Sequence, residues 1–209
     1  QWQEDDGSGW SDLSDGGVYS NTDQATMNIT GAILGMNGND YRCVVTGTCN
    51  PPATSASAQL TVNELPTITD DPQDTTICEG NDASFSVTAS GTGITYQWQE
   101  DDGSGWSDLS DGGVYSNTDQ ATLNLTGVPS TMNGNDYRVV VTGTCTPPAT
   151  SASAQLTVNE SPTITADPQD STVCEGNDAS FSVTATGEGL TYQWQEDDGS
   201  GWSDLSDGG

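Results

Sequence analysis

The sequence contains no histidine and no lysine, and Arg42 and Arg138 are its only basic side chains. Against 31 acidic residues they leave a formal net charge of −29. This balance excludes nucleic-acid binding, because a protein that holds phosphates needs lysine or arginine along one face. The missing histidine removes the side chain that titrates nearest neutral pH and the commonest ligand of zinc and copper. The composition therefore argues against hydrolases and metalloenzymes, and we expect no enzymatic activity.

Long apolar runs are also missing. No run of 18 apolar residues could form a membrane-spanning helix, so we expect no membrane insertion in this segment. Hydrophobic residues make up 31% of the chain, a low fraction that at this charge is typical of disorder. Six tryptophans, six tyrosines and alternating runs of Val, Thr and Ile favour folded β-structure instead.

A 96-residue repeat accounts for the whole chain. The decapeptide at 1–10 recurs unchanged at 97–106 and at 193–202. Residues 1–96 share 81 identities with residues 97–192. Such similarity indicates recent duplication and membership of a larger array.

Two prolines mark the junctions between repeats. Pro66 and Pro162 each follow the end of an alternating run. They predict one complete repeat at 65–160, with partial repeats at 1–64 and 161–209. Because the first residue falls inside a strand-like run, we expect the chain to be a window on a longer array, with signal peptide and anchor outside it.

Strand-like segments fill the complete repeat. They alternate small or apolar residues with polar ones at 83–89, 94–99, 121–126, 137–141 and 152–158. Segments rich in Gly, Asn, Asp and Pro separate them, and no helical period is present. The pattern predicts an all-β protein made of antiparallel β-sandwiches.

Two positions in these segments carry a family resemblance. Trp98 matches a core tryptophan on strand C, and Tyr137 matches the tyrosine corner of strand F. In these features the repeat resembles the immunoglobulin-like domain, and in particular the Ig-like tandem repeats of large bacterial surface and secreted proteins. The resemblance implies immunoglobulin-like sandwiches arranged end to end, with strands C to G in 1–64 and strands A to C′ in 161–209.

The resemblance also shows a departure from the family pattern. Both positions of the usual inter-sheet disulfide hold valine, Val87 and Val139. The core is therefore expected to pack without that bond. The first repeat has Cys43 in place of Val139, and we expect a buried free thiol there.

Four further cysteines recur at two positions of the repeat, Cys78 and Cys174 at one, Cys49 and Cys145 at the other. Cys78 precedes the A–B turn, near the end of the domain where strand G leaves, whereas Cys145 lies near the end where strand A enters. At about 3.3 Å per strand residue these ends lie more than about 20 Å apart, too far for one disulfide bond. We therefore expect disulfides between consecutive domains, with the intradomain pair Cys78–Cys145 as the alternative.

Clustered carboxylates suggest two kinds of site. Asp101 and Asp102 precede a glycine-rich turn and Trp106, but adjacent strand residues point to opposite faces, so we interpret this segment as a C–C′ hairpin rather than a catalytic pair. Acids at each junction could bind calcium through oxygen ligands, with a solvated acidic face as the alternative. The calcium candidates are Glu64, Asp70, Asp71 and Asp74.

Acceptor motifs for glycosylation occur along the chain. Some are Asn-x-Ser/Thr motifs, some flank a proline-rich, mucin-like segment, and some resemble the Asp-Ser/Thr-Thr triplet of a bacterial O-glycosylation system. The alternative is the ordinary composition of β-rich proteins. The candidate acceptors are Asn28, Asn124, Asn159, Thr75, Ser171, Thr146 and Thr150.

Near-identical repeats fit a spacer better than a catalyst, because a spacer needs the same module many times. We predict a secreted bacterial structural protein, a filament or surface stalk whose partners are neighbouring repeats and covalent glycans. The competing hypothesis is an adhesin in which exposed aromatic residues bind surface glycans or other cells through avidity. The candidate contacts are Trp10, Trp106 and Tyr115.

Overall fold

The structure is a computed structural model that describes residues 1–206. Short strands make up nearly all of its regular structure, together with two turns of 3-10 helix, η1 (Leu34–Met36) and η2 (Ser130–Met132). In this part of the chain no helix has the length and hydrophobicity needed to cross a membrane. The last three residues of the predicted third segment, 207–209, lie outside the described residues.

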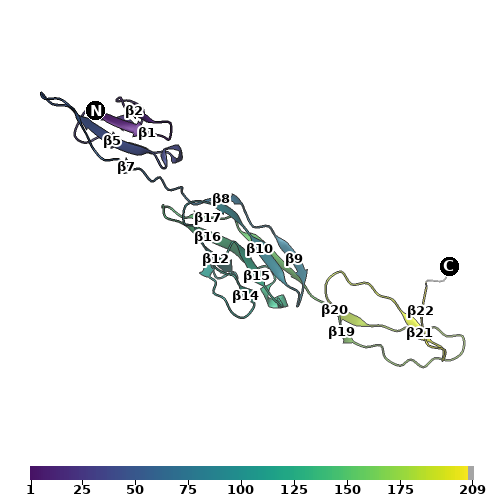
Figure 1. Ribbon diagram of the computed structural model, residues 1–209. Helices are drawn as coiled ribbons and strands as arrows, with labels where there is room; N and C mark the ends of the chain where they lie inside the picture. The colour runs from purple at the N-terminus through teal and green to yellow at the C-terminus, as the bar shows by residue number, and fades with distance from the viewer. Residues whose placement is uncertain (207–209) are drawn as a thin grey trace. The chain divides into compact units, whose positions relative to one another are not determined.

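The complete repeat contains strands β8 to β18 (Figure 1). Their bounds are β8 (Thr67–Asp70), β9 (Thr75–Cys78), β10 (Ala83–Ser86), β11 (Thr88–Ser90), β12 (Thr95–Asp101), β13 (Ser107–Asp108), β14 (Tyr115–Ser116), β15 (Thr122–Leu125), β16 (Asp136–Thr142), β17 (Ala149–Thr150) and β18 (Ala154–Asn159).

These strands form two sheets and a short ladder. One sheet has the order β13-β12-β16-β18-β9, with β17 also paired to β16, and the other has the order β10-β15-β14. A two-stranded ladder joins β8 to β11. All recorded pairings are antiparallel except that of β9 with β18, which is parallel. The predicted all-β sandwich is confirmed, with one parallel edge that the sequence did not indicate.

The core lies between the two sheets. Phe85 on β10 stacks on Tyr137 on β16, with ring centroids 4.8 Å apart and an interplanar angle of 27°. Along β16 every second side chain is buried, beginning with Tyr137 and Val139. Trp98 is fully buried on β12 and Leu123 on β15. The two-residue period of the sequence therefore sets which side chains form the core.

One predicted strand is split in two. The segment 83–89 appears as β10 and β11, separated at Val87. β10 pairs with β15, whereas β11 pairs with β8 and carries a register shift between Thr88 and Ala89. At this break the chain stops pairing with β15 and begins pairing with β8. Successive side chains still alternate between the buried and the exposed face, so the two-residue pattern of the sequence does not reveal the break.

The flanking repeats are partial and have fewer strands. The first contains β1 (Trp2–Asp5), β2 (Trp10–Asp12), β3 (Tyr19–Ser20), β4 (Asn28–Ile29), β5 (Asp40–Val45), β6 (Ala53–Thr54) and β7 (Ala58–Gln59). The third contains β19 (Thr163–Ala166), β20 (Thr184–Thr186), β21 (Gln195–Asp197) and β22 (Trp202–Asp204).

Contacts divide the chain into two compact units. The first comprises Gln1–Asp70, Thr88–Tyr96 and Val140–Thr150. The second comprises Asp71–Val87, Gln97–Val139 and the described residues from Ser151 onward. The limits of these units do not coincide with the limits of the 96-residue repeat. The repeat boundaries at 64/65 and 160/161 therefore stay predictions from the sequence.

Candidate functional site

One carboxylate organises the polar end of the core in the complete repeat. Glu100, on β12, accepts hydrogen bonds at Oε1 from the hydroxyl groups of Tyr115 at 2.6 Å and Tyr137 at 2.8 Å. Nδ2 of Asn135 donates to the same oxygen at 2.7 Å. Tyr137 occupies the predicted tyrosine-corner position, but its hydroxyl bonds to a side-chain carboxylate, whereas a tyrosine corner bonds to the backbone. The arrangement ties β12, β14 and β16 together.

The first repeat contains the same cluster around Glu4. Its Oε1 accepts hydrogen bonds from Tyr19 at 2.6 Å, Tyr41 at 2.7 Å and Asn39 at 2.8 Å. Burial acts to raise the pKa of Glu4, but the hydrogen bonds from the two tyrosines and the asparagine outweigh it, and the pKa is lowered. The carboxylate is therefore ionised in the folded protein and acts as a fixed acceptor.

The tyrosines of the complete repeat are correspondingly held neutral. Burial, then the hydrogen bonds of the cluster, raises the pKa of Tyr137. Burial and the hydrogen bond to Glu100 raise the pKa of Tyr115. A tyrosinate would place a second negative charge against Glu100, so these hydroxyls remain donors. The cluster links three strands of the sandwich.

The predicted hairpin at Glu100–Trp106 is confirmed. β12 and β13 pair antiparallel, with Gln99 opposite Asp108. Asp101 Oδ1 accepts hydrogen bonds from the backbone N–H groups of Gly103 and Gly105, each at 2.9 Å. Both glycines have positive φ, +94° and +102°, which side chains disfavour. Asp101 therefore stabilises the turn.

The three candidate ligand-contact residues are less exposed than the sequence suggested. Trp106 is half-buried, and the guanidinium of Arg138 lies 4.1 Å from its ring centroid. Trp10 is covered in the same way by Arg42, at 4.0 Å. Tyr115 is half-buried in the Glu100 cluster. The expectation of freely exposed aromatic rings is wrong, because the two arginines stack on the tryptophans.

The calcium candidates do not come together as a metal site. Within residues 1–206 no group of three or more His, Cys, Asp or Glu side chains could hold a metal ion. Asp71 Oδ1 instead accepts a hydrogen bond from the N–H of Ala152 at 2.9 Å, and Asp74 Oδ1 accepts one from Gln155 at 2.8 Å.

The other two calcium candidates have separate local roles. Glu64 Oε1 accepts a long hydrogen bond from Ser90, at 3.4 Å, and Asp70 pairs with Thr88 in the β8–β11 ladder. The proposed four-carboxylate site therefore has no structural basis in the described residues. The carboxylates of Asp71 and Asp74 accept hydrogen bonds from backbone N–H groups, and that of Glu64 accepts one from a serine hydroxyl.

All five cysteines are free thiols, including Cys43, whose free state was expected and which is half-buried. Cys49, Cys78 and Cys174 are exposed. The predicted location of Cys78 is confirmed, because it pairs with Asn159 at the end of the last strand. Cys145 is half-buried and lies beside the chain that enters the complete repeat, with Sγ 3.6 Å from the carbonyl oxygen of Asn63. The disulfide pairing itself stays a prediction.

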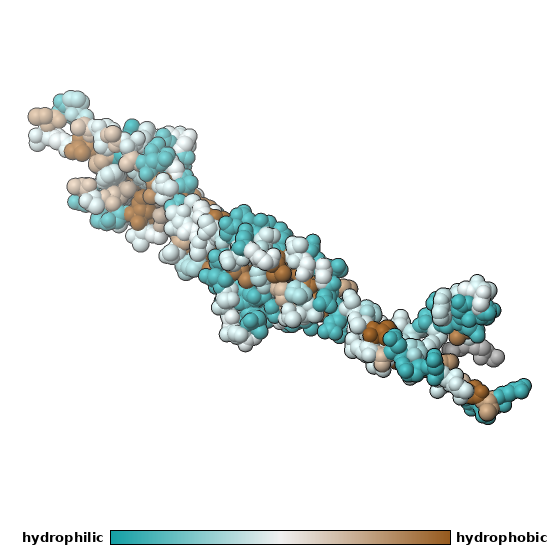
Figure 2. All heavy atoms as spheres, turned by 90° about the horizontal axis from the view of Figure 1, so that it is seen from below, coloured by the Kyte–Doolittle hydropathy of each residue, from teal (hydrophilic) through white to brown (hydrophobic). Residues whose placement is uncertain are grey.

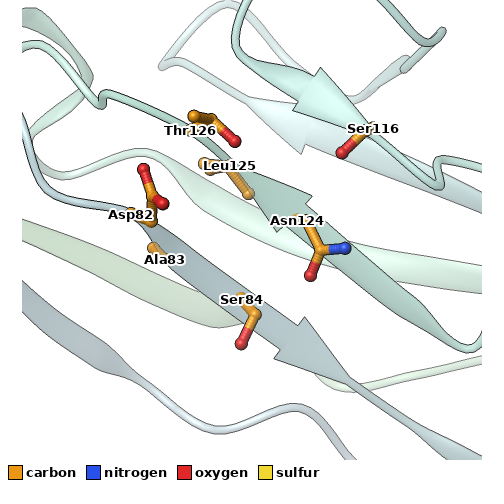
Figure 3. A pocket seen from close by; sticks show the side chains of 7 residues that line it. All are labelled: Asp82, Ala83, Ser84, Ser116, Asn124, Leu125 and Thr126. Atoms are coloured by element: carbon orange, nitrogen blue, oxygen red, sulfur yellow. The ribbon is translucent and has the colours of Figure 1, made fainter.

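Asn124 lies in a shallow polar depression on the outer face of the β10-β15-β14 sheet. Its register partners are Ser84 on β10 and Ser116 on β14, and Figure 3 shows it between their hydroxyl groups. The depression has a volume of about 410 Å³. Leu123 and Leu125, on either side of Asn124, are fully buried, so its outward orientation is confirmed. Asn124 is itself half-buried, and its amide faces outward from β15.

The other glycosylation candidates differ in accessibility. Asn28, Thr146, Thr150 and Ser171 are exposed, whereas Thr75 and Asn159 are half-buried in strands. Thr75 also donates a weak hydrogen bond to the carbonyl of Gln73, at 3.4 Å. Exposure favours the first four positions as acceptors.

The chain is similar in fold to solved structures of tandem immunoglobulin-like domains. An I-band fragment of titin matches with a TM-score of 0.67 and 17% identity, covering 100% of this chain and 71% of that one. A 3Ig structure of titin that carries E-to-A mutations matches with a TM-score of 0.65 and 16% identity, over the same shares of the two chains. The fold is that of tandem immunoglobulin-like domains. No protein-family model and no curated protein matches the sequence.

Proposed function

We propose that the chain is a segment of a structural filament or surface stalk outside a bacterial cell, built from near-identical immunoglobulin-like domains and glycosylated. The observation that carries this proposal is the ordered connection by which the chain enters a repeat. Glu64 donates its N–H to Oγ1 of Thr92 at 2.9 Å and accepts the N–H of Thr92 at 3.1 Å. At the next junction the carbonyl of Glu160 accepts the N–H of Glu188, the counterpart of Thr92, at 3.2 Å.

Close backbone packing accompanies these hydrogen bonds. A Cβ added to Gly91 would lie 3.0 Å from Cα of Pro66 and 3.1 Å from the carbonyl oxygen of Leu65. A Cβ on Gly187 would meet Pro162 and Ser161 at 2.9 to 3.0 Å. Glycine is thus required at both positions, where φ is also positive, at +141° and +131°. The chain that enters a repeat is thus packed against that repeat, which suits domains connected end to end.

The surface chemistry also supports a spacer. The net charge of −29 comes from carboxylates, many of which accept hydrogen bonds from backbone N–H groups rather than from cations. On the face drawn in Figure 2, hydrophilic residues predominate and hydrophobic ones form small scattered patches. Like charge on every repeat opposes lateral association of neighbouring chains over a screening length of about 8 Å at physiological salt.

Glycans would add a neutral hydrated layer to this acidic surface. The exposed acceptor Thr150 lies in β17, the exposed acceptor Thr146 lies in the loop before it, and Asn124 lies on a sheet face. Sugars there would cover strand edges and protect them from pairing and proteolysis. The competing adhesin hypothesis has less support, because arginine already covers one face of Trp10 and of Trp106.

Electron microscopy of intact source cells tests the proposal. Antibodies raised against residues 65–160 should label thin structures outside unpermeabilised cells. Labelling only after permeabilisation would contradict the extracellular location. The intact mass of the native protein tests the glycans separately, since a mass equal to that of the bare polypeptide would remove them from the proposal.

A further inference from the structure

We propose that consecutive repeats are joined by a disulfide bond between the β9 cysteine of one repeat and the cysteine that follows β16 in the next. In this chain Cys78 would bond to the counterpart of Cys145 one repeat later. The inference rests on the proposed function in one respect only, namely that the repeats continue as an array.

The first observation is the environment of Cys78. It pairs with Asn159 in the parallel β9–β18 ladder. The next residue, Glu79, donates its backbone N–H to the carbonyl oxygen of Asn159 at 2.9 Å. The β9 cysteine of a complete repeat therefore lies beside the asparagine that ends that repeat's last strand.

The second observation is the environment of Cys145. Its Sγ lies 3.6 Å from the carbonyl oxygen of Asn63. Asn63 is the counterpart of Asn159, 96 positions earlier in the repeat. The cysteine after β16 therefore lies beside the asparagine that ends the preceding repeat.

Together these contacts bring two cysteines to one backbone position. Where the preceding repeat is complete, the carbonyl of Asn63 would be approached both by the N–H that follows its β9 cysteine and by the Sγ of Cys145. A disulfide bond between the two cysteines needs their Cα atoms to lie about 4.4–6.8 Å apart, so it requires both to lie on the same side of this shared backbone position. A thiol is a weaker hydrogen-bond donor than a backbone N–H, so the N–H would displace Cys145 from the carbonyl oxygen of Asn63. The Sγ of Cys145 could then bond to the Sγ of the β9 cysteine of the preceding repeat.

The same geometry explains why Cys78 and Cys145 are free thiols in this chain. The partner of Cys145 would be the β9 cysteine of the first repeat, and the partner of Cys78 would follow β16 of the third. Neither position is contained in the 209 residues. Bond formation removes two protons and two electrons from the two thiols, and the co-reactant is a disulfide oxidant such as oxidised glutathione, whose S–S bond is reduced to two thiols.

Completing the third repeat provides the test. The chain is extended after its last residue by a copy of residues 114–160 and oxidised with a glutathione redox buffer. It is then digested without reduction by a protease that cleaves at acidic residues. Mass spectrometry should recover one cross-linked peptide joining Cys78 to the added counterpart of Cys145, whereas the unextended chain should give none.

Matched variants identify the bond. Cys78→Ser should abolish the cross-link, and Cys174→Ser, at the same position of the last repeat, should leave it intact. A cross-link between Cys78 and Cys145, or free thiols at both partners, would overturn the proposal. Alkylation of denatured native material without reduction gives an independent readout, because counterparts of Cys78 that label as free thiols along the array would contradict the bond. Neither result bears on whether the protein forms extracellular filaments.

Discussion

The complete repeat and the third segment have nearly the same sequence and different burial. Phe85 is 1% exposed, whereas its counterpart Phe181 is 56% exposed. Trp98 is 0% exposed and Trp194 is 40% exposed. The third segment lacks the strands that follow β13 in the complete repeat. The residues of strands A to C′ therefore carry the pattern of a sandwich, but the later strands supply the opposing half of its core.

Some strands of the third segment are also shorter than their counterparts in the complete repeat, or missing. β12 extends over Thr95–Asp101, whereas its counterpart β21 is limited to Gln195–Asp197. The counterpart of β9, residues 171–174, forms no strand. β-Propensity depends on cross-strand neighbours. β12 and β9 lie beside β16 and β18, respectively, in the complete repeat, whereas the third segment contains no counterparts of β16 and β18. Local sequence alone therefore does not determine the length of these strands.

Completing the third segment should produce the largest change. Extension by a copy of residues 114–160 should bury Phe181 and Trp194, because β15, β16 and β18 counterparts would then cover them. Tryptophan emission should move to shorter wavelength, and backbone amides of 161–206 should gain protection from hydrogen exchange. An extension of equal length made of Gly and Ser is the control, and equal protection with both extensions would contradict the account.

Trp98→Ala should destabilise the complete repeat by about 3–5 kcal/mol, because it removes a large buried side chain. It also removes the hydrogen bond that Nε1 donates to the carbonyl of Gln120 at 2.8 Å. Trp194→Ala, the same substitution in the third segment, should shift the main urea transition far less. Equal shifts for the two variants would show that exposure does not distinguish the sites.

Glu100→Ala should cost about 2–3 kcal/mol, because it leaves three donors without their shared acceptor, one of them on the fully buried Tyr137. Glu196→Ala is the matched control, since the chain lacks the third-repeat counterparts of Tyr115 and Tyr137. The urea midpoint of the control should equal that of the parent chain. A similar loss in both variants would contradict the role of the cluster.

The smallest effect concerns pH. Hydrogen bonds from the backbone N–H and then the hydroxyl of Thr118 lower the pKa of Asp111. A lowered folded-state pKa stabilises the protein above the ordinary aspartate pKa of about 3.9, and the contribution is lost as pH falls through the folded value. The urea midpoint of the parent should therefore exceed that of Asp111→Asn at pH 6, and the difference should shrink as the pH falls below the ordinary aspartate pKa and through the lowered folded-state pKa. A difference that is constant over this range would exclude the linkage.

Much of the fold follows from the two-residue period. The predicted segment 137–141 lies within β16, 121–126 contains β15, and Val87 is buried where the family pattern has a cysteine. The parallel β9–β18 pairing could not be predicted from this period. The alternation determines which face of the sheet a residue points to, but it does not determine which strand lies beside it. The break between β10 and β11 was missed for the same reason.

The role of Glu100 could have been found in the sequence. It lies two positions after Trp98, so both point to the same face of β12. A carboxylate on the core side of a strand needs hydrogen-bond donors, and the sequence had already assigned Tyr137, which carries a hydroxyl, to the tyrosine corner. The positions of Asp71 and Asp74 were harder to predict, because their donors lie 81 residues further along the chain.

Length measurement on arrays of increasing repeat number tests the central claim most directly. Chains with three, six and nine complete copies of residues 65–160, imaged by negative-stain electron microscopy, should give contour lengths that increase in proportion to the number of copies. A stalk of domains connected end to end requires that proportionality. Particles whose longest dimension barely grows from three copies to nine would show that the repeats collapse on one another, and would contradict the account.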